Sequence, residues 1–334
     1  MKINKTIYLT IAIFTLAMVF MACSSGKVTW KHQEIAYIDT GINPDAWALV
    51  PAGEFFEGQF KNLNHLKNID YDYEIMVTDV TNAQYARYLN EALAAGKIKV
   101  EGNRVLGYYP GDKYYGYRHE RKIDPGDYLY FALEEPGTRI KFDGKTFTVD
   151  RGFENHPVTM VTWFGARAYC QFYGWRLPTE LEWEKAARGT KFTAYPWGNE
   201  IGPEYANFNL SNKEIRRVLG VKHGITTPVG FFNGKKYGDF QTKDARSPYG
   251  LYDMAGNVWQ WIADKYPKMS DRFMKGGSWM NYDIYLRIWM RNSALPWYYS
   301  INVGFRCVRD VKKPETTEEA TEEIQKEEGE NLEK

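Results

Sequence analysis

Residues 156–189 read HPVTMVTWFGARAYCQFYGWRLPTELEWEKAARG and contain two helix signals. The first begins at Thr162, a residue type favoured at helix N-caps, and ends at Gly174. Between these limits Trp163 and Cys170 fall on one face at helical spacing. We therefore expect a short helix whose Cys170 side chain points into the core.

The second signal in this stretch is a capping box, in which Thr179 and Glu182 each bond the backbone N–H of the other. Gly189 follows its last turn, as expected at a helix end. The same pattern occurs upstream at Thr81–Gln84, and Gly96 stops that helix. The sequence thus predicts two or three helices, each with a defined start and end.

Short strands separated by turns are expected on both sides of these helices. Trp47–Phe56 reads as a strand containing a Pro–Ala–Gly turn, and residues 97–156, rich in Tyr and Gly, read as an extended loop insertion. Within this insertion an Asp–Gly turn predicts a hairpin over 139–149. From residue 190 onward we expect short strands and no helix longer than two turns. A single, loop-rich α+β domain over 45–310 is therefore predicted.

The first residues resemble an export signal. Lys2 and Lys5 form a basic start, and Ile7–Ala22 is an apolar run shorter than the roughly 20 residues that span a bilayer. Cys23 follows directly. A cysteine at this place predicts a lipoprotein signal over 1–22 and an acylated Cys23 that anchors the chain in a membrane. An uncleaved signal anchor and plain secretion are the alternatives.

The two ends of the exported chain differ from its middle. Residues 23–44 read as a tether, and 311–334, with nine Glu and four Lys and no aromatic residue, read as an acidic disordered tail. The formal net charge is +1, so the rest of the chain carries +6 against the tail's −5. This balance is too mild to indicate nucleic acid, and no such partner is expected.

The chain has three cysteines. If Cys23 is acylated, Cys170 and Cys307 remain, and in an exported protein we expect a disulfide between them rather than two free thiols. No CxxC or HExxH motif occurs and the five histidines are scattered, so a zinc site is not expected.

Eight segments between Ala46 and Arg309 together resemble a known family. They are LVPAGEFFEG, DVTNAQYARYL, the stretch 156–189, YPWGNE, SPYGLYDMAGNVWQWIAD, KGGSW, RNS and NVGFRCVR. In this order they resemble the formylglycine-generating enzyme domain, also called the sulfatase-modifying factor domain. The resemblance implies a single-domain, loop-rich variant of the C-type lectin fold, and a structural disulfide between Cys170 and Cys307.

The same resemblance implies a copper site that this chain lacks. In the catalytic branch of the family, two cysteines shortly after the Gly-Gly-Ser motif bind copper, and the enzyme oxidises a sulfatase cysteine with dioxygen. Paired thiolates suit Cu(I). Here the first family cysteine falls on Asn281 and the second near Leu286, so copper is not expected.

A calcium site is also implied. The matching ligands are the Asp253 side chain, the carbonyls of Gly256 and Val258, and Gln260. Calcium prefers several oxygens with carboxylates among them. Because the family usually has an acid where Gln260 stands, the sequence leaves calcium binding open.

A binding cleft is the last candidate site. Its candidate residues are Ser278, Trp279, Asn281, Arg287, Arg291 and Trp297. The arginines and tryptophans could instead form a salt-bridged aromatic shell, and Gly-Gly-Ser could mark a tight backbone passage. The segment Tyr108–Tyr130 is a candidate partner surface or an ordered insertion that covers the core.

Three functions follow as hypotheses. The first is a lipid-anchored, non-oxidising binding or assembly component of the Gram-negative cell envelope, in the outer membrane, with other envelope proteins as partners. Its layout is similar to lipoproteins of gliding-motility and type IX secretion machinery. The second is an active oxidase of the formylglycine-generating class. The third is a lectin-like receptor for a glycan or peptide.

Overall fold

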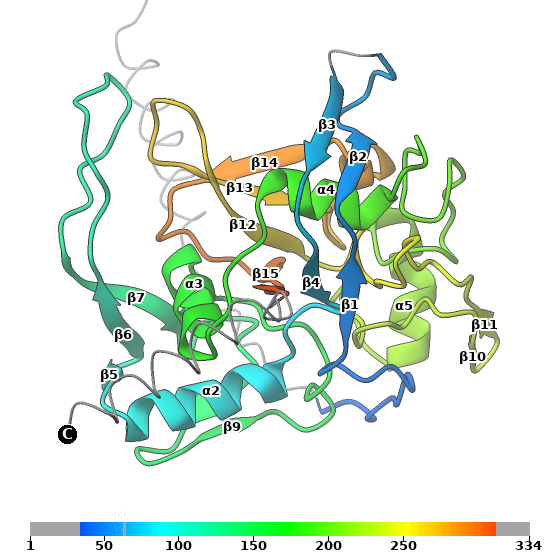
Figure 1. Cartoon of the computed structure of the whole chain (residues 1–334). Helices are drawn as coiled ribbons and strands as arrows, with labels where there is room; N and C mark the ends of the chain where they lie inside the picture. The colour runs from blue at the N-terminus through cyan, green and yellow to red at the C-terminus, as the bar shows by residue number, and fades with distance from the viewer. Residues whose placement is uncertain (1–33, 63–64, 312–334) are drawn as a thin grey trace, which may run out of the picture. The chain divides into compact units, whose positions relative to one another are not determined.

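The computed structural model describes residues 34–62 and 65–311 (Figure 1). The predicted signal peptide, Cys23 and all of the acidic tail except its first residue, Val311, lie outside these residues.

Four α-helices lie in the described part of the chain. They are α2 (Asn82–Ala94), α3 (Trp163–Phe172), α4 (Glu180–Arg188) and α5 (Asn212–Leu219). The N-caps predicted at Thr81, Thr162 and Thr179 are confirmed, and both capping boxes form through Gln84 and Glu182. Short 3-10 helices occupy Asn209–Ser211 (η2) and Asp283–Leu286 (η3).

The strands are short and divided among several small sheets. They are β1 (Trp47–Val50), β2 (Gly53–Phe56), β3 (Leu66–Ile69), β4 (Tyr73–Met76), β5 (Ile98–Glu101), β6 (Arg104–Tyr109), β7 (Gly126–Ala132), β8 (Ile140–Phe142), β9 (Phe147–Val149), β10 (Lys236–Tyr237), β11 (Phe240–Gln241), β12 (Trp259–Lys265), β13 (Arg272–Lys275), β14 (Arg291–Ala294), β15 (Val303–Phe305) and β16 (Val308–Asp310). The sheets have the orders β1-β4-β16, β14-β13-β12-β15 and β5-β6-β7, with the pairs β2-β3, β8-β9 and β10-β11.

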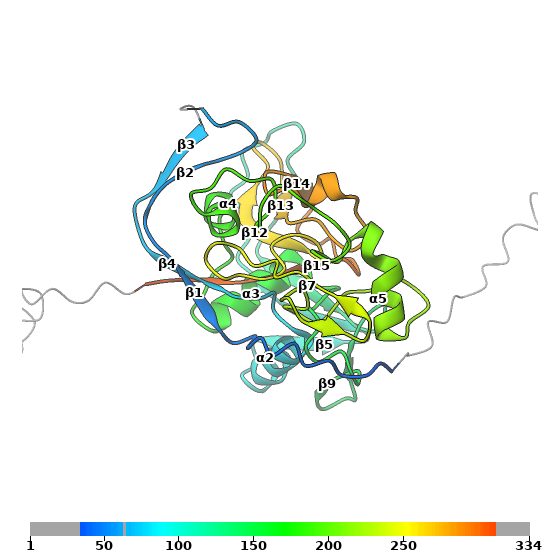
Figure 2. The ribbon, with the colours of Figure 1, turned by 90° about the vertical axis from the view of Figure 1, so that its right-hand side faces the viewer.

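The sheet β1-β4-β16 joins the first and last strands of the domain. β4 is its central strand and runs antiparallel to both neighbours, with Ile75 opposite Ala48 and Val308. Tyr73 and Ile75 point to one side, as strand alternation requires, and are fully buried beside Trp183 of α4. Figure 2 shows β1 and β4 side by side at the edge that faces away from α5.

Helix α4 contacts both β3 and the strands β12 and β13, and Figure 1 shows it between these elements. Charged side chains also join α4 to β2 and the residues that flank it. Lys185 Nζ donates to the carbonyls of Pro51 and Gly53 at 2.6 and 2.8 Å, and Arg188 Nη1 donates to those of Phe56 and Gly58. Such bonds allow α4 to be buried despite its polar sequence, because each cation finds backbone acceptors.

The insertion at 97–156 is more regular than the sequence suggested. The predicted hairpin is confirmed as β8-β9, but β5, β6 and β7 form a sheet where we expected extended loop. The segment between β6 and β7, residues 110–125, remains a long loop and projects from the sheet in Figure 1. The strands were missed because β6 (RVLGYY) has no regular alternation.

Two further expectations need correction. α5, with eight residues, is slightly longer than the two turns that we expected as the limit for a helix after residue 190, and its charged sequence NKEIRRVL buries just Ile215 and Leu219. Residues 34–44, assigned to the tether, pack on the domain: Ile35 and Thr40 are buried, and Thr40 Oγ1 donates to the Val229 carbonyl at 2.9 Å. The folded domain therefore begins before residue 45.

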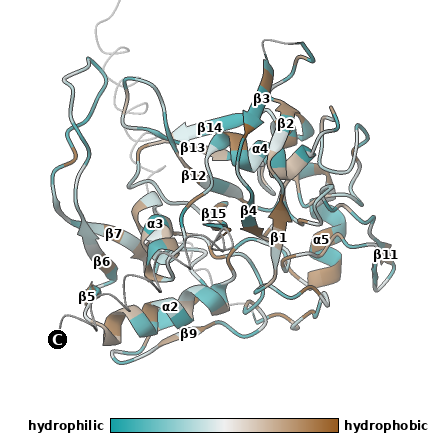
Figure 3. Cartoon of the chain, in the orientation of Figure 1, coloured by the Kyte–Doolittle hydropathy of each residue, from teal (hydrophilic) through white to brown (hydrophobic). Residues whose placement is uncertain are grey.

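The core is rich in aromatic rings. Tyr85, Tyr88 and Tyr169 pack with Phe305, with ring centroids 5.3–6.1 Å apart. A disulfide joins buried Cys170 of α3 to buried Cys307, just before β16. Figure 3 shows how hydrophobic and hydrophilic stretches alternate along α2, which covers this cluster with its apolar face.

Candidate functional site

The segment after β13 carries three of the cleft candidates, Ser278, Trp279 and Asn281. Gly276 and Gly277 have φ values of +93° and +70°, a region that favours glycine. A Cβ atom on Gly277 would lie 2.8 Å from Leu286 Cδ1 and from the Tyr285 carbonyl oxygen. The double glycine is therefore required where this loop folds back on itself, and it places Ser278 at the loop's base.

Ser278 is fully buried and organises its neighbours through hydrogen bonds. Its Oγ donates to Asn281 Oδ1 at 2.6 Å and accepts from Asn302 Nδ2 at 3.0 Å. Trp279 Nε1 donates to the Ile301 carbonyl at 3.3 Å. Ser278, Trp279 and Asn281 are thus brought together, with Asn302 as a partner that the sequence did not reveal.

The two positions that match the family's copper cysteines carry no soft ligand. Asn281 is an amide whose oxygen already accepts from Ser278, and Leu286 is fully buried. Both described cysteines, Cys170 and Cys307, are joined to each other. A hard amide oxygen and an alkyl group do not fit Cu(I), which prefers paired thiolates.

Apolar side chains cover the outside of the same loop. Met280, Tyr282, Ile284 and Tyr285 are 48%, 58%, 45% and 43% exposed. η2 adjoins this segment, because Asn209 N donates to the Asn281 carbonyl at 2.9 Å. These residues form an exposed apolar surface, which we call the 280–285 surface.

The remaining cleft candidates make other contacts. Arg287 lies over Trp289 at 5.9 Å, and Arg291 Nη1 pairs with Glu180 Oε2 at 2.9 Å. Trp297 is 39% exposed on a separate loop. The salt-bridged aromatic arrangement that we considered as the alternative therefore describes Arg287 and Arg291 better than a common cleft does.

The calcium candidates belong to a buried network centred on Gln260. Gln260 Oε1 accepts from Trp183 Nε1 at 2.7 Å and from Arg306 Nε at 2.9 Å. Its Nε2 donates to the Asp253 carbonyl at 2.7 Å, and Asp253 Oδ2 accepts from Gly230 N. Both lone pairs of the Gln260 amide oxygen are used, so it has none for a metal.

Arg306 supplies the positive charge in this network and is fully buried. Its five N–H groups donate to the carbonyls of Met76, Val77 and Tyr252, to Gln260 Oε1 and to Asp79 Oδ1. Burial raises the pKa of Asp79 to about 8 and that of Asp253 to about 6, although Arg306 opposes both shifts.

The geometry around Asp253, Gly256, Val258 and Gln260 consequently does not fit calcium. The Arg306 guanidinium already supplies a positive charge near the Asp253 carboxylate, and the Gln260 amide oxygen that would face a cation already accepts two hydrogen bonds. In the described residues, no group of three or more His, Cys, Asp or Glu side chains is arranged to hold a metal ion.

A hollow about 700 Å³ in volume lies beside α3 and α4 and was not anticipated from the sequence. Tyr71, Trp163, Arg167, Arg176 and Val311 are among its lining residues.

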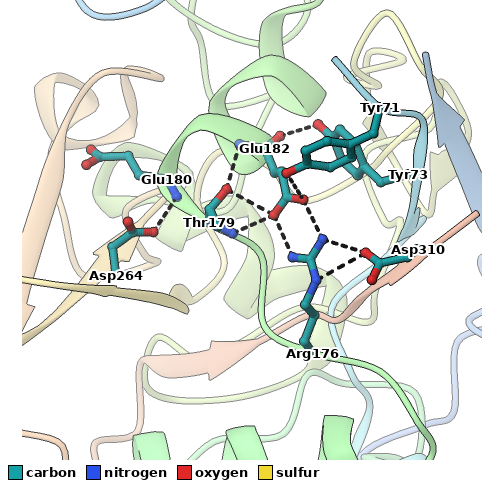
Figure 4. Close-up of polar contacts among 8 residues, drawn as sticks. All are labelled: Tyr71, Tyr73, Arg176, Thr179, Glu180, Glu182, Asp264 and Asp310. Atoms are coloured by element: carbon teal, nitrogen blue, oxygen red, sulfur yellow. Dashed lines mark hydrogen bonds and ion pairs between the residues drawn. The ribbon is translucent and has the colours of Figure 1, made fainter. Parts of the chain in front are cut away.

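Arg176 lines this hollow, and Figure 4 shows it between Asp310 and Glu182. Arg176 Nη1 and Nη2 donate to the two Glu182 oxygens at 2.7 and 2.6 Å, and Nη2 also reaches Asp310 Oδ1 at 2.7 Å. Burial of Glu182 favours its neutral form, but hydrogen bonds from Arg176 and Thr179 outweigh it, so the pKa of Glu182 lies below its usual value. Through these bonds to Glu182 and Asp310, Arg176 links α4 to β16.

Comparison with known proteins identifies the family of this fold. The model of the sulfatase-modifying factor enzyme 1-like domain matches residues 38–311. The inactive C-alpha-formylglycine-generating enzyme 2 of Bos taurus is 38% identical over 168 residues, which cover 47% of this chain and 52% of that protein. The formylglycine-generating enzyme of Thermomonospora curvata is 36% identical over 211 residues, covering 56% of this chain and 62% of that protein.

The chain therefore spans less than two thirds of the length of either relative. Among solved structures, PvdO from Pseudomonas aeruginosa has a TM-score of 0.50 at 19% identity, covering 79% of this chain and 94% of that chain. At this identity the likeness concerns the fold alone. The chain belongs to the sulfatase-modifying factor enzyme 1-like family, and the predicted loop-rich α+β fold of the C-type lectin kind is confirmed.

Proposed function

We propose that this chain is a lipid-anchored, non-oxidising member of its family that binds other proteins of the Gram-negative envelope, at the outer membrane. The observation that carries the proposal is the chemistry at Asn281 and Leu286. One is a hydrogen-bonded amide and the other is buried hydrocarbon, so the thiolates that activate dioxygen in the catalytic branch have no counterpart. A gliding-motility or secretion machine is the kind of assembly we propose for it.

The 280–285 surface supports a binding role. Met and aromatic residues are enriched at protein interfaces, and exposed apolar side chains that gather on one loop favour contact with a partner. The Bos taurus relative is itself named inactive, which is consistent with a family that includes members without the oxidation.

The membrane anchor rests on Cys23, which lies outside the described residues. No helix in residues 34–62 and 65–311 has the length and apolarity needed to cross a bilayer. We propose acylation of Cys23 as the attachment, and a Cys23→Ser chain should then leave the membrane fraction.

Photo-crosslinking in intact cells tests the proposal. A photoreactive residue is placed at Tyr282, on the 280–285 surface, or at Tyr37, an equally exposed control elsewhere (58% and 57% exposed). We expect a discrete adduct with an envelope protein from position 282 that is absent from position 37. Equal or absent labelling at both positions would refute the binding role of this surface.

The lectin-like alternative predicts a different result. If a glycan is the ligand, the purified full chain should bind particular sugars on an array, and no protein adduct should form at position 282.

A further inference from the structure

The loop at 110–125 is long but firmly held. Glu120 Oε2 accepts from the backbone N–H groups of Tyr115 and Tyr117 at 2.8 and 3.2 Å. Arg121 N donates to Ser270 Oγ at 2.7 Å, and that hydroxyl donates back to the Arg121 carbonyl at 2.9 Å. The loop is thus pinned to the turn between β12 and β13 and presents a fixed outer face.

That face combines aromatic rings with cations, and we call it the tyrosine loop face. It consists of Lys113, Tyr114, Tyr115, Tyr117, Arg118, Arg121, Lys265 and Lys268. The three tyrosines are 42–56% exposed. Lys113 Nζ lies 4.9 Å from the Tyr115 ring centroid, and Lys268 Nζ lies 5.8 Å from that of Tyr117.

The nearby acids do not neutralise this face. Asp112 pairs with buried Arg272, and Glu120, with its side chain 3% exposed, is used by backbone N–H groups and by Lys265. Asp124 pairs with Lys122. Asp271 is the remaining acid beside the loop.

Four of the five cations on this face have no carboxylate partner among the residues that the structure describes: Lys113, Arg118, Arg121 and Lys268. Only Lys265 pairs with an acid, Glu120. The face therefore keeps an excess of positive charge.

The described chain ends at the hollow beside α3 and α4. Val311 lines the 700 Å³ hollow together with Arg167 and Trp163. The guanidinium of Arg272 lies 4.3 Å from the Trp163 ring centroid and pairs with Asp112 at the start of the loop. A continuous set of contacts therefore connects the point where the chain leaves the domain with the base of the loop.

We propose that the acidic segment 312–334 of this same chain binds the tyrosine loop face. The segment carries nine Glu against four Lys, opposite in sign to the face. Its 23 residues can extend about 75 Å at about 3.3 Å per residue, ample to reach a loop whose base is linked to the hollow through Arg272. Because the segment is tethered, its effective concentration is on the order of millimolar, so weak ion pairs suffice. This contact does not depend on the function proposed above.

Zero-length crosslinking of carboxylates to lysines tests the contact on the full chain in a non-ionic detergent. Mass spectrometry then locates the lysines joined to Glu residues of 315–333. We expect the products to concentrate on Lys113, Lys265 and Lys268 rather than on Lys213 or Lys236. A mixture of nitrogen-15 and nitrogen-14 chains separates contacts within one chain from those between chains.

Charge reversal provides the decisive comparison. Arg118→Glu with Arg121→Glu leaves the reporter lysines intact and should lower their crosslink yield by about tenfold, since two attractive pairs become repulsive. The matched control, Lys213→Glu with Arg217→Glu on exposed positions of α5, should leave the yield unchanged. Added salt at 0.5 M should also abolish the products.

Several results would overturn the proposal: crosslinks spread evenly over the lysines, equal yields in both variants, or products only between chains. A third variant that ends at Val311 tests whether the face serves another anion. If full and shortened chains bind anionic vesicles equally well, the segment does not cover the face and the proposal fails. Stronger binding by the shortened chain supports it.

Discussion

Replacing Arg306 by methionine removes the centre of the buried network while keeping a side chain of similar length. The guanidinium is fully buried and all five of its N–H groups are used. Arg306→Met therefore leaves Asp79 without its cation and takes the side-chain donor from the carbonyls of Met76 and Tyr252, while the Val77 carbonyl keeps a bond from the Tyr252 N–H.

The size of the effect follows from those partners. Above about pH 8, where Asp79 is ionised, breaking this buried ion pair by removing one member costs about 3–5 kcal/mol, and each stranded neutral acceptor adds about 1 kcal/mol. We expect a loss of at least about 5 kcal/mol in the free energy of unfolding, a large share of the 5–15 kcal/mol typical of whole proteins. The variant should be marginally folded or unfolded at 37 °C.

Urea unfolding followed by tryptophan fluorescence measures this change. Arg309→Met is the matched control, because Arg309 pairs with Glu74 at the surface with side chains 39% and 29% exposed and should cost about 1 kcal/mol or less. A second variant, Arg306→Met with Asp79→Leu, should recover part of the loss, since it removes the unpaired carboxyl. Equal losses for Arg306→Met and Arg309→Met would refute the structural role of the network.

Three further predictions follow from the same structure. Calcium at 1 mM and excess EDTA should give the same melting temperature, because Gln260 is fully hydrogen-bonded; a rise with calcium would show that the network opens to bind it. Removing the disulfide by Cys170→Ala with Cys307→Ala should lower the free energy of unfolding by about 5 kcal/mol, according to the chain-entropy model for a separation of 137 residues. Urea unfolding measures this loss, and a loss below about 1 kcal/mol would contradict the prediction. Asp79 and Asp253 have folded-state pKa values of about 8 and about 6, above their usual values, so the folded state binds their protons more tightly than the unfolded state does. The two groups therefore make the free energy of unfolding fall as pH rises from about 4 to 8. Asp253→Asn should flatten the part of this fall below pH 6, and an unchanged pH profile would count against burial as the cause.

Capping and turn rules correctly predicted the helix starts and the hairpin, because these features depend only on residues close together in the sequence. Thr81, Thr162 and Thr179 begin helices because their side chains satisfy free N–H groups nearby in the chain, and that pattern is visible in one sequence. The Asp–Gly hairpin was predicted for the same reason. α5, which slightly exceeds the two-turn limit expected in this region, was not located because its sequence is highly charged and little of it is buried.

The candidate sites depended on contacts between distant segments, which the sequence alone cannot show. Gln260 looked like a calcium ligand from its place in a motif, but its partners come from α4 and from Arg306, 77 and 46 residues away. The hollow beside Arg176 arises where α3, α4 and β16 meet. No local sequence pattern predicts such a hollow. The one local signal was that Arg176 and Glu182 lie on either side of a predicted helix start.

The most direct measurement of the central claim is an oxidation assay on the full chain. The protein is supplied with Cu(I), dioxygen and a cysteine-bearing sulfatase-type peptide, beside an active formylglycine-generating enzyme as positive control, and the peptide is followed by mass spectrometry. We expect the cysteine to stay unconverted, since Asn281 and Leu286 offer no thiolate. Enzymatic appearance of the aldehyde would contradict the account.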